Sequence, residues 1–495
     1  MSAPGRRWQA VLIVALVAVA VVGAAFSGWW YARESPPHQG PIVLISVDNL
    51  GAAALSPYGA SGSDTPAIEA LAADGVVFDR AFAHSPQTLP SHASILSGQL
   101  PFEHGVRDDA GFALKDEART LAELLRNRGF ETGAAVSTFL LRRESGIAQG
   151  FGFFDADLPE AGTTSASVVA RNASLTIDAA ERWMRTQDGQ RFLLFVQVDG
   201  SEADATVSRL VRELRDLNLY DGATIVLVGD HGDTPPPSLA DTALRVPLII
   251  KQPGRQGAGR RVVMPVQHID LLPTILDLVR APVPSGIQGR SLRAVLDDEE
   301  AVLAEQPVYA ESLAAHFRLG GQALYGVTSG ALRYVGGGRE GLFDLQAGGG
   351  SLPLDSPDAA RLRGVLEGLV NQRPTDRPTA IPAADEDAYA ALGYLPAPRL
   401  PHVAPIAIER NAETALIALH RSAALLVGQR RLGAAIDRLR TIVRAQPAVA
   451  IVHYQIGWLL LRTARYQEAA VAFAEAARLQ PDDAGIAVAL TAAEL

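Results

Sequence analysis

Two acids at the ends of apolar stretches are the side chains of this chain best suited to bind a cation. Asp48 ends the stretch Pro41–Asp48 (PIVLISVD), and Asp230, followed directly by His231, ends the stretch Ala223–Asp230 (ATIVLVGD). Because carboxylates and imidazoles bind divalent cations, we predict a site for one ion, either Ca²⁺, Mg²⁺, Mn²⁺ or Zn²⁺. The alternative is that Asp48 caps a helix and Asp230 is a turn residue.

A hydroxyl suited to attack an ester lies between these acids in the sequence. Thr88 belongs to the stretch Ser85–Gly98 (SPQTLPSHASILSG), in which we expect a turn around Thr88. Beside a cation, this hydroxyl would serve as a nucleophile and as a metal ligand, while the cation absorbs charge from the leaving anion. His92 is a candidate hydrogen-bond partner or general base for it. The alternatives are that Thr88 is a plain turn hydroxyl and that His92 is a half-buried helix residue.

The elements that must position these side chains alternate between strands and helices. Besides the two apolar stretches, we expect strands at residues 131–137 and 192–199 and helices at residues 118–128, 166–185 and 205–217. The strands are almost continuously apolar, which is typical of a doubly wound α/β sheet that helices bury on both faces. Sites in such sheets lie beyond the carboxyl ends of the strands, and Asp48, Asp199 and Asp230 all fall there.

The amino-terminal residues 1–33 differ in composition from the α/β domain, which we assign to residues 41–398. Arg6 and Arg7 precede Ala10–Ala32, an uncharged apolar run that is long enough to span a bilayer. We predict a single-pass anchor in the cell membrane, with the bulk of the chain periplasmic or extracellular. The alternative is a cleaved signal peptide.

The strand pattern stops after residue 398, and residues 409–495 have a helical pattern. The segment Tyr454–Asp483 is similar to a tetratricopeptide repeat, and Pro481 follows Pro447 by the 34-residue period of that repeat. We therefore expect two repeats and a final helix at Ala484–Leu495. Two repeats are few for an independent solenoid, so we expect them to dock on the α/β domain, to self-associate or to bind a partner protein.

The composition excludes several classes of function. The 495 residues carry a net charge of −10 and include no cysteine. The acidic balance gives no electrostatic case for nucleic acid binding. The absence of cysteine excludes disulfides, thiolate metal sites and lipoprotein anchoring.

A series of motifs follows one another between residues 41 and 395. After the strand that ends at Asp48 come TPAIEALAADGVVFDRAFAHSP, then Thr-Leu-Pro-Ser-His at residues 88–92, and then SILSGQLPFEHGV. GDHGD, LRVPLII, IDLLPTILDL, GLFDLQ and ALGYL follow further along the chain. This ordered set resembles the sulfatase branch of the alkaline phosphatase superfamily. The resemblance implies a sulfatase-like α/β fold and a metal-dependent hydrolase or transferase that acts on an anionic sulfate or phosphate ester.

The resemblance also suggests roles for single residues. Thr88 falls at the nucleophile position, where sulfatases convert Cys or Ser to formylglycine. Threonine is a secondary alcohol, so we expect no formylglycine and an attack by the plain hydroxyl. Asn49 falls where many sulfatases carry a second Asp, and would supply a neutral oxygen ligand to the metal. Arg142 and Arg143 would bind a substrate anion or form a solvated face.

Several positions depart from the pattern of the resembled family. His92 stands in place of the signature arginine, and Gln197 stands in place of a loop histidine. The usual lysine after the strand at residues 131–137 is absent, and the segment after GDHGD is short. These departures leave open an alternative function, in which the chain is a catalytically impaired scaffold whose helical repeats bind a partner.

Overall fold

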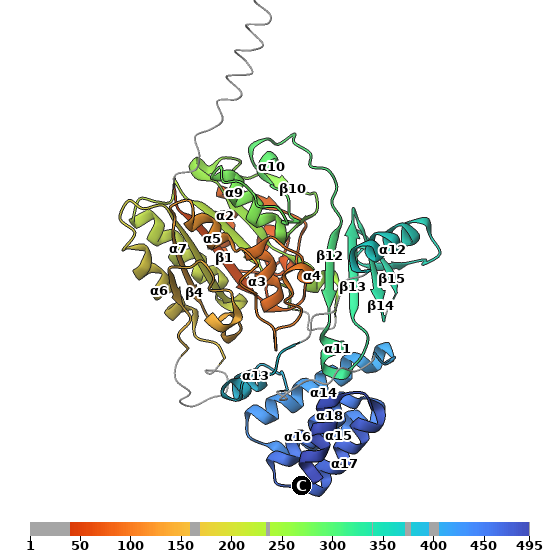
Figure 1. Ribbon diagram of the computed structural model, residues 1–495. Coiled ribbons are helices and arrows are strands. Elements are labelled where there is room, and N and C mark those ends of the chain that lie inside the picture. Colours follow the sequence, from red (N-terminus) through yellow and green to blue (C-terminus); the bar gives the residue numbers. More distant parts are fainter. Residues whose placement is uncertain are drawn as a thin grey trace, which may run out of the picture.

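The structure of the protein is a computed structural model in which residues 40–158, 169–233, 238–338, 340–371, 378–395 and 405–494 are described. An α/β domain, an antiparallel sheet and a helical region follow one another along the chain (Figure 1). The predicted membrane anchor at residues 1–33 lies outside the described residues. Among the described residues, no helix has both the length and the apolar character of a membrane span.

An eight-stranded sheet forms the centre of the α/β domain, with the strand order β10-β2-β9-β7-β1-β6-β4-β5. Its central strand β1 (Ile42–Asp48) is parallel to β6 (Phe192–Asp199) on one side and to β7 (Thr224–Gly229) on the other. The other strands are β2 (Val76–Phe78), β4 (Glu131–Val136), β5 (Phe153–Asp155), β9 (Leu248–Lys251) and β10 (Arg261–Val262). β9 alone among these runs antiparallel to its neighbours in the described sheet. The predicted α/β fold is therefore confirmed.

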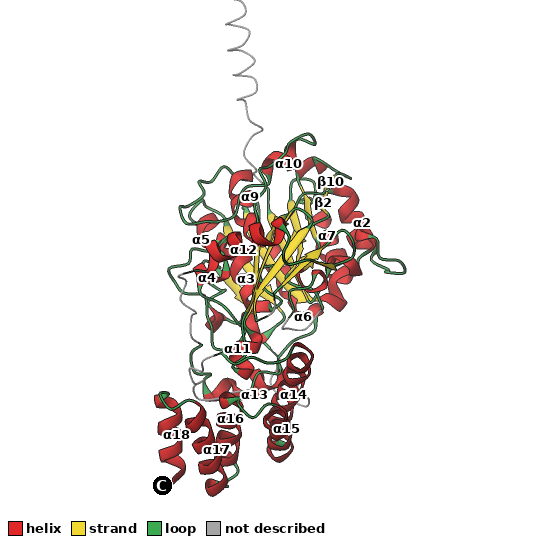
Figure 2. Cartoon of the chain, turned by 90° about the vertical axis from the view of Figure 1, so that its right-hand side faces the viewer, coloured by secondary structure: helices red, strands yellow, loops and turns green. Residues whose placement is uncertain are grey.

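Helices cover both faces of this sheet (Figure 2). Val43, Ile45 and Val47 of β1 belong to an apolar core that includes α2 (Pro66–Asp74), α6 (Ala173–Met184) and α7 (Ala203–Asp216). Ile42 and Leu44 belong to the core on the other face, which includes α3 (Thr88–Ser97), α5 (Leu121–Arg126) and α9 (Leu271–Leu278). Because alternate residues of a strand point to opposite faces, β1 is buried on both sides and its end is fixed in position.

Two further sheets accompany the large sheet. A small sheet contains β3 (Ala81–Phe82), β8 (Arg245–Val246) and β11 (Val266–Gln267). A five-stranded antiparallel sheet contains β12 (Val308–Ser312), β13 (Leu324–Ser329), β14 (Leu332–Gly337), β15 (Gly341–Asp344) and β16 (Gly350–Leu352). The helix α12 (Pro357–Val370) packs on it, whereas α4 (Pro101–His104), α8 (Asp241–Leu244), α10 (Arg293–Asp297), α11 (Ala314–Leu319) and α13 (Glu386–Ala391) are short connecting helices. The five-stranded antiparallel sheet was not predicted from the sequence.

The carboxyl-terminal region consists of paired helices. These are α14 (Arg410–Gly428), α15 (Leu432–Ala445), α16 (Ala450–Arg462), α17 (Tyr466–Leu479) and α18 (Ala484–Glu494). α15 begins at Leu432 and α17 at Tyr466, 34 residues later, and the same interval separates the starts of α16 and α18. The starts of these two pairs of helices are therefore separated by the period that the sequence predicts, whereas the interval between the starts of α14 and α16 is longer. The predicted final helix corresponds to α18.

The helical region is docked on the rest of the chain. One apolar core joins Leu416 and Ile417 of α14 to Ala315 and Leu319 of α11 and to Ala390 of α13. α13 and α14 lie between the α/β domain and the remaining helices (Figure 1). Of the three arrangements that the sequence left open, the structure contains docking.

Candidate active site

The two predicted metal-binding acids lie side by side at the carboxyl ends of neighbouring strands. Asp48 is the last residue of β1, and Asp230 follows the last residue of β7. Because β1 and β7 are parallel and paired, their ends meet at one edge of the sheet. Asp199 ends β6 at the same edge, but its Oδ1 accepts hydrogen bonds from the backbone N–H and the hydroxyl of Ser201. The structure therefore brings Asp48 and Asp230 together and leaves Asp199 as a turn residue.

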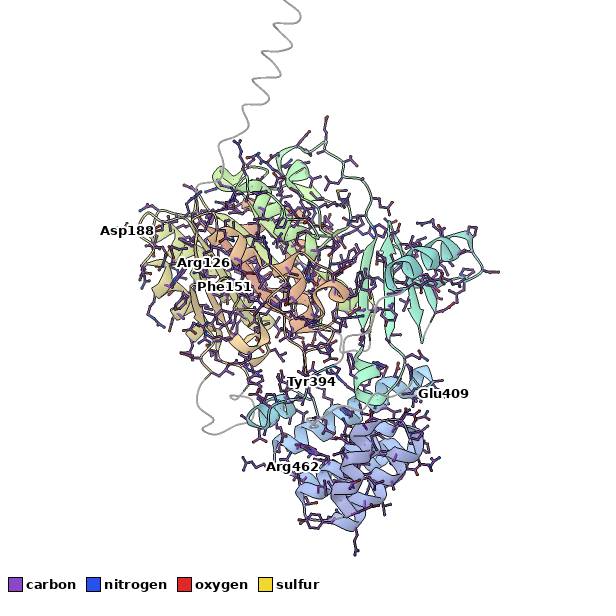
Figure 3. The ribbon with its side chains drawn as sticks, in the orientation of Figure 1. Arg126, Phe151, Asp188, Tyr394, Glu409 and Arg462 are labelled. Carbon is purple, nitrogen blue, oxygen red and sulfur yellow. The ribbon has the colours of Figure 1, made fainter. Side chains whose placement is uncertain are left out.

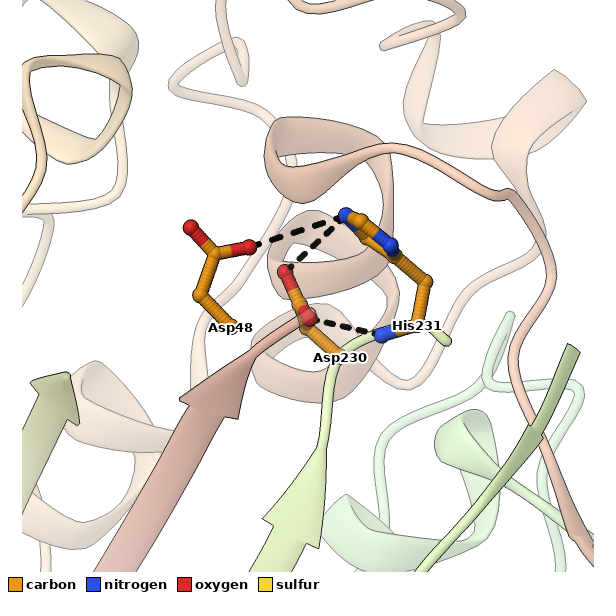
Figure 4. Close-up of side chains that lie close together, drawn as sticks. All are labelled: Asp48, Asp230 and His231. Carbon is orange, nitrogen blue, oxygen red and sulfur yellow. Dashed lines mark hydrogen bonds and ion pairs between the residues drawn. The ribbon is translucent and has the colours of Figure 1, made fainter. Parts of the chain in front are cut away.

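His231 presents one ring nitrogen to both acids (Figure 4). Its Nε2 lies 3.6 Å from Asp48 Oδ1 and 3.6 Å from Asp230 Oδ2. Its Nδ1 lies 2.9 Å from the carbonyl oxygen of Gly232, which can only accept a hydrogen bond. Nδ1 is therefore the donor, and the lone pair is on Nε2, between the two carboxylates. This is the tautomer that binds a metal ion.

Asp230 is a buried carboxylate in which only one of the two oxygens accepts hydrogen bonds. Its Oδ1 accepts hydrogen bonds from the backbone N–H of His231 at 2.6 Å and of Asn49 at 3.0 Å. Its Oδ2 is buried and has no hydrogen-bond partner. Burial, reinforced by the charge of Asp48, raises the pKa of Asp230 well above its ordinary value. Because a divalent cation between the two carboxylates would offset both effects, the residues present fit a metal ion.

Asn49 contributes to this arrangement through its backbone. Its φ of 58° lies in the left-handed region, which asparagine tolerates better than most residues. This conformation directs its N–H to Asp230, while its side chain is exposed at the cavity described below. The contact that the structure contains is therefore a backbone hydrogen bond to the acid, whereas we had expected a side-chain ligand.

Thr88 lies beside the two acids, on the first residue of a helix. Its Oγ1 donates to Asp48 Oδ1 over 3.1 Å and lies 3.4 Å from His231 Nε2. The expected turn is wrong in its position, because Thr88 is already the first residue of α3. Helix α3 packs on α9 and belongs to the same apolar core as Ile42 and Leu44 of β1, so the hydroxyl is held on a buried, rigid element. The structure brings together Asp48, Thr88, Asp230 and His231.

His92 is fully buried and has partners for both ring nitrogens. Its Nδ1 donates to the carbonyl oxygen of Thr88 at 2.7 Å, and its Nε2 accepts from Ser46 Oγ at 2.8 Å. Burial lowers the pKa of His92 to about 4, so the ring is neutral near pH 7. No ring nitrogen is left to take a proton from the Thr88 hydroxyl. The geometry favours a positioning role, in which His92 ties Thr88 to β1.

The two arginines predicted to bind the substrate have partners elsewhere. Arg142 forms an ion pair with Asp385 at 2.5 Å and lies 3.8 Å from the ring centroid of Phe139. Arg143 donates to the carbonyl oxygen of Phe154 at 3.0 Å. Neither arginine lines the cavity above Thr88. These contacts argue against the anion-binding role.

A cavity of about 590 Å³ opens above Thr88. Its lining comes from the strand ends, the start of α3, α11, the segment after α13, and α14, and comprises Asp48, Asn49, Leu50, Pro86, Gln87, Thr88, Asp109, Thr138, Leu140, Asp199, Gly200, Ser201, His231, Asp233, Arg318, Leu392, Tyr394 and Arg421. Tyr394 lies where the α/β domain meets the helical region (Figure 3). Gln197, at the position of the expected histidine, does not line the cavity, because it is buried and accepts a hydrogen bond from the backbone N–H of Ser137.

Sequence reasoning missed Asp109 at this cavity. Its Oδ1 accepts from the backbone N–H of Leu89 at 2.7 Å, and its Oδ2 accepts from the hydroxyl of Tyr394. Burial and the neighbouring Asp108 raise the pKa of Asp109 to about 6. The only signal in the sequence is the pair Asp108-Asp109 shortly after the HGV motif. Arg318 and Arg421 were missed as well, since both come from parts of the chain remote from every motif.

Comparisons with known proteins find similarity to sulfatases. Residues 41–203 match the sulfatase family model, and residues 229–318 match the model of the N-sulphoglucosamine sulphohydrolase carboxyl-terminal domain. N-acetylgalactosamine-6-sulfatase from Sus scrofa is 29% identical over 140 residues, which are 26% of this chain and 24% of that protein. The ulvan-active sulfatase from Formosa agariphila is 22% identical over 346 residues, which are 54% of this chain and 67% of that protein.

Solved structures extend the likeness of the fold. The phosphonate monoester hydrolase from Silicibacter pomeroyi superposes with a TM-score of 0.56 at 18% identity, covering 69% of this chain and 96% of that one. A structure in complex with D-glucosamine-2-N,6-O-disulfate superposes with a TM-score of 0.57 at 17% identity, covering 70% of this chain and 99% of that one. At these identities the likeness establishes the fold. The chain spans about a quarter of the length of the first curated relative above.

Proposed function

We propose that this chain is a sulfatase-like, metal-dependent hydrolase or transferase that acts on an anionic sulfate or phosphate ester, with the Thr88 hydroxyl as nucleophile. The observation that carries the proposal is a cluster in which ligand atoms of Asp48, Asp230 and His231 lie within 4.8 Å of one another. Thr88 Oγ1 contacts two members of this cluster, Asp48 Oδ1 at 3.1 Å and His231 Nε2 at 3.4 Å. The sulfatase family match and the solved neighbours, which include a phosphonate monoester hydrolase, support the same class of reaction.

Asp48, Asp230, His231 and Thr88 would hold one divalent cation, and the described residues offer this one cluster of acidic and histidine ligands. When bound, the cation would favour the ionised form of the hydroxyl and reduce the charge that builds up during ester cleavage. The ligands are oxygens and one imidazole, which suit Ca²⁺, Mg²⁺, Mn²⁺ or Zn²⁺.

Asp48 and Thr88 would carry out the proton transfer and the formation of the new bond. Asp48 Oδ1 already accepts the hydrogen bond of Thr88 Oγ1, so it is positioned to accept that proton as the hydroxyl attacks. The bond from Oγ1 to phosphorus or sulfur forms, the bond to the leaving oxygen breaks, and its electron pair departs with that oxygen. Water or an acceptor alcohol then cleaves the ester on Thr88.

This route favours phosphate over sulfate esters. A phosphorylated threonine can be attacked at phosphorus, whereas a sulfated threonine has no easy elimination path. We expect activity on phosphate mono- or diesters to exceed activity on sulfate esters. Thr88→Ala should abolish the activity and Thr88→Ser should retain part of it, in assays with matched aryl phosphates and aryl sulfates. Mass spectrometry after a substrate quench should find an adduct on the peptide that contains Thr88.

Two outcomes would contradict the proposal. Activity that survives Thr88→Ala would refute the nucleophile and the mechanism together. A protein that binds no metal and turns over no ester would support the scaffold alternative, which is favoured by one observation, the buried Gln197 at the expected histidine position. In that alternative the helical region is the functional surface.

Two further parts of the proposal concern the ends of the chain. We propose that residues 1–33 anchor the protein in the cell membrane with its bulk outside the cytoplasm, as their apolar run indicates. Protease added to intact spheroplasts should digest the α/β domain, and protection of that domain would contradict the topology.

We also propose that the region from α14 to α18 is built from tetratricopeptide-like repeats, as its 34-residue period suggests, and binds a protein partner.

A further inference from the structure

The cavity above Thr88 has a basic wall that the eight-stranded sheet does not supply. Asp48 and His231 line it at the strand ends, whereas Arg318 of α11 and Arg421 of α14 line it where the helical region docks. Both arginines come from elements that follow the large sheet in the sequence. The cavity therefore combines an acidic cluster, suited to a cation, with a pair of guanidinium groups, suited to an anion.

Arg318 is a buried cation with few partners. Its side chain is 8% exposed, and its guanidinium carbon lies 4.7 Å from the ring centroid of Tyr394. Its Nε is buried without a hydrogen-bond partner, and no ion pair of Arg318 occurs within the described part of the chain. Burial raises the pKa of nearby Asp108, and the charge of Arg318 opposes that rise. Because a buried guanidinium is stabilised by acceptors, an anion in the cavity would complete its surroundings.

Arg421 reaches the cavity because a glycine makes room for it. Gly393 has a φ of +93°, and a Cβ on this residue would lie 2.5 Å from Arg421 Cγ. The absence of a side chain at Gly393 therefore allows α14 to bring its arginine against the segment that carries Tyr394. Arg421 is exposed to the cavity and forms no ion pair with any residue that the structure describes.

The docking of α14 fixes this arginine relative to the α/β domain. Leu416, Ile417 and Ala424 of α14 are buried in the same apolar core as Leu319 of α11 and Leu395. A helix held by a buried core keeps its backbone at a fixed position relative to the cavity, so the point from which the Arg421 side chain extends is fixed. Arg421 is therefore part of the wall of the site.

Arg318 and the Thr88 hydroxyl contact different parts of the cavity. From Thr88, the contacts run through the backbone N–H of Leu89 to the carboxylate of Asp109, then through the hydroxyl and ring of Tyr394 to Arg318. A carboxylate and an aromatic ring thus stand between them along this chain of contacts. A cavity of about 590 Å³ also exceeds what a single tetrahedral anion fills, and is typical of sites for larger organic ligands.

We propose that Arg318 and Arg421 bind an anionic group that the substrate carries in addition to the ester group beside Thr88. The substrate class is then an organic ester with a second negative charge at its far end. This inference rests on the proposed function, since it takes Thr88 as the position of the reacting ester.

A matched pair of ligands tests the inference. Phenyl phosphate and 4-carboxyphenyl phosphate differ by one carboxylate at the far end of the ring. Calorimetry on the Thr88→Ala protein with a divalent cation should show about tenfold tighter binding of the carboxylated compound, the effect of one charge-assisted contact. Arg421→Ala in that background should remove this preference and leave phenyl phosphate within about twofold, and Arg421→Lys should restore part of it.

Arg438→Ala is the matched control, because Arg438 is an exposed arginine of α15 that does not line the cavity. It removes the same charge and should leave both affinities unchanged. Equal weakening of both compounds by Arg421→Ala, or no change in either, would overturn the inference. Arg318→Ala should act like Arg421→Ala, and its melting temperature shows whether the fold tolerates the change. If the wild type turns over no ester, the proposed function fails, while the binding comparison still decides the inference.

Discussion

Asp230→Asn separates the metal from the fold because it changes one charge at nearly constant shape. The amide oxygen of asparagine can still accept from the backbone N–H groups of His231 and Asn49, as Asp230 Oδ1 does. The amide nitrogen replaces Oδ2, the atom that is buried without a partner, and cannot bind a cation. Without metal, the variant should be more stable than the wild type, because it removes a buried charge beside Asp48.

With metal, the order should reverse. A cation at 100 times its dissociation constant stabilises the wild type by about 2.7 kcal/mol. For a domain of the size of residues 41–398, an unfolding entropy of about 2.1 cal/mol/K per residue gives roughly 0.75 kcal/mol/K. The melting temperature of the wild type should therefore rise by about 3–4 °C with the correct cation, and that of Asp230→Asn should not change.

The assay is thermal melting in chelator and then in Ca²⁺, Mg²⁺, Mn²⁺ or Zn²⁺ in turn, with elemental analysis of the dialysed protein. Asp199→Asn is the matched control, because Asp199 also ends a strand and lines the cavity but is hydrogen-bonded to Ser201. It should keep the full response to metal. A metal-dependent rise of equal size in Asp230→Asn would refute the assignment of this carboxylate as a ligand.

The remaining predictions concern stability. Phe473→Ala should destabilise the helical region by about 3–5 kcal/mol, because the ring is buried and packs on Gly457 and Tyr454. An unchanged chemical denaturation curve of that region would argue against this packing. Burial lowers the pKa of both His104 and His420 to about 3, from an ordinary value near 6.5. As the pH falls, both imidazoles are therefore protonated in the unfolded chain before they are protonated in the folded one. The contribution of the two buried, neutral imidazoles to the free energy of unfolding is thus fully present above pH 6.5 and is lost as the pH falls from there towards 3. Chemical denaturation between pH 7 and pH 4 should show this decrease in the free energy of unfolding. His420→Gln should make the free energy of unfolding less dependent on pH, and an unchanged dependence would contradict the lowered pKa of His420.

The parts of the fold that the sequence predicted are those with a strong local signal. The apolar runs that end at Asp48 and Asp230 are recognisable as strands because they are buried on both faces, and their parallel pairing is enough to bring the two acids together. Thr88 was predicted as a candidate from its order among the motifs, but the start of α3 at this residue was not, because the prolines beside it are as common in turns as in the first turn of a helix.

The parts that the sequence did not predict depend on long-range packing. The full burial of His92 follows from its contact with Ser46 on β1, which no local pattern reveals. Asn49 was assigned through its side chain, whereas its backbone conformation determines its contact with Asp230. Arg318 and Arg421 reach the cavity through the docking of α11 and α14. The order of residues in the sequence does not show how close these helices lie to the ends of the strands.

The docking of α14 has a consequence for the order in which the protein matures. Synthesis proceeds from the amino terminus, and domains fold largely as they emerge. The strands that carry Asp48 and Asp230 are complete before any residue of α14 exists, whereas Arg421 is made only after α11 and α13. Before α14 is made, the α/β domain would thus already hold Asp48, Thr88, Asp230 and His231 together, and the cavity beside them would be open on the side of α14. A chain that lacks α14 would also lack Arg421, one of the two arginines that we propose bind the substrate, and the cavity would be open to solvent on that side.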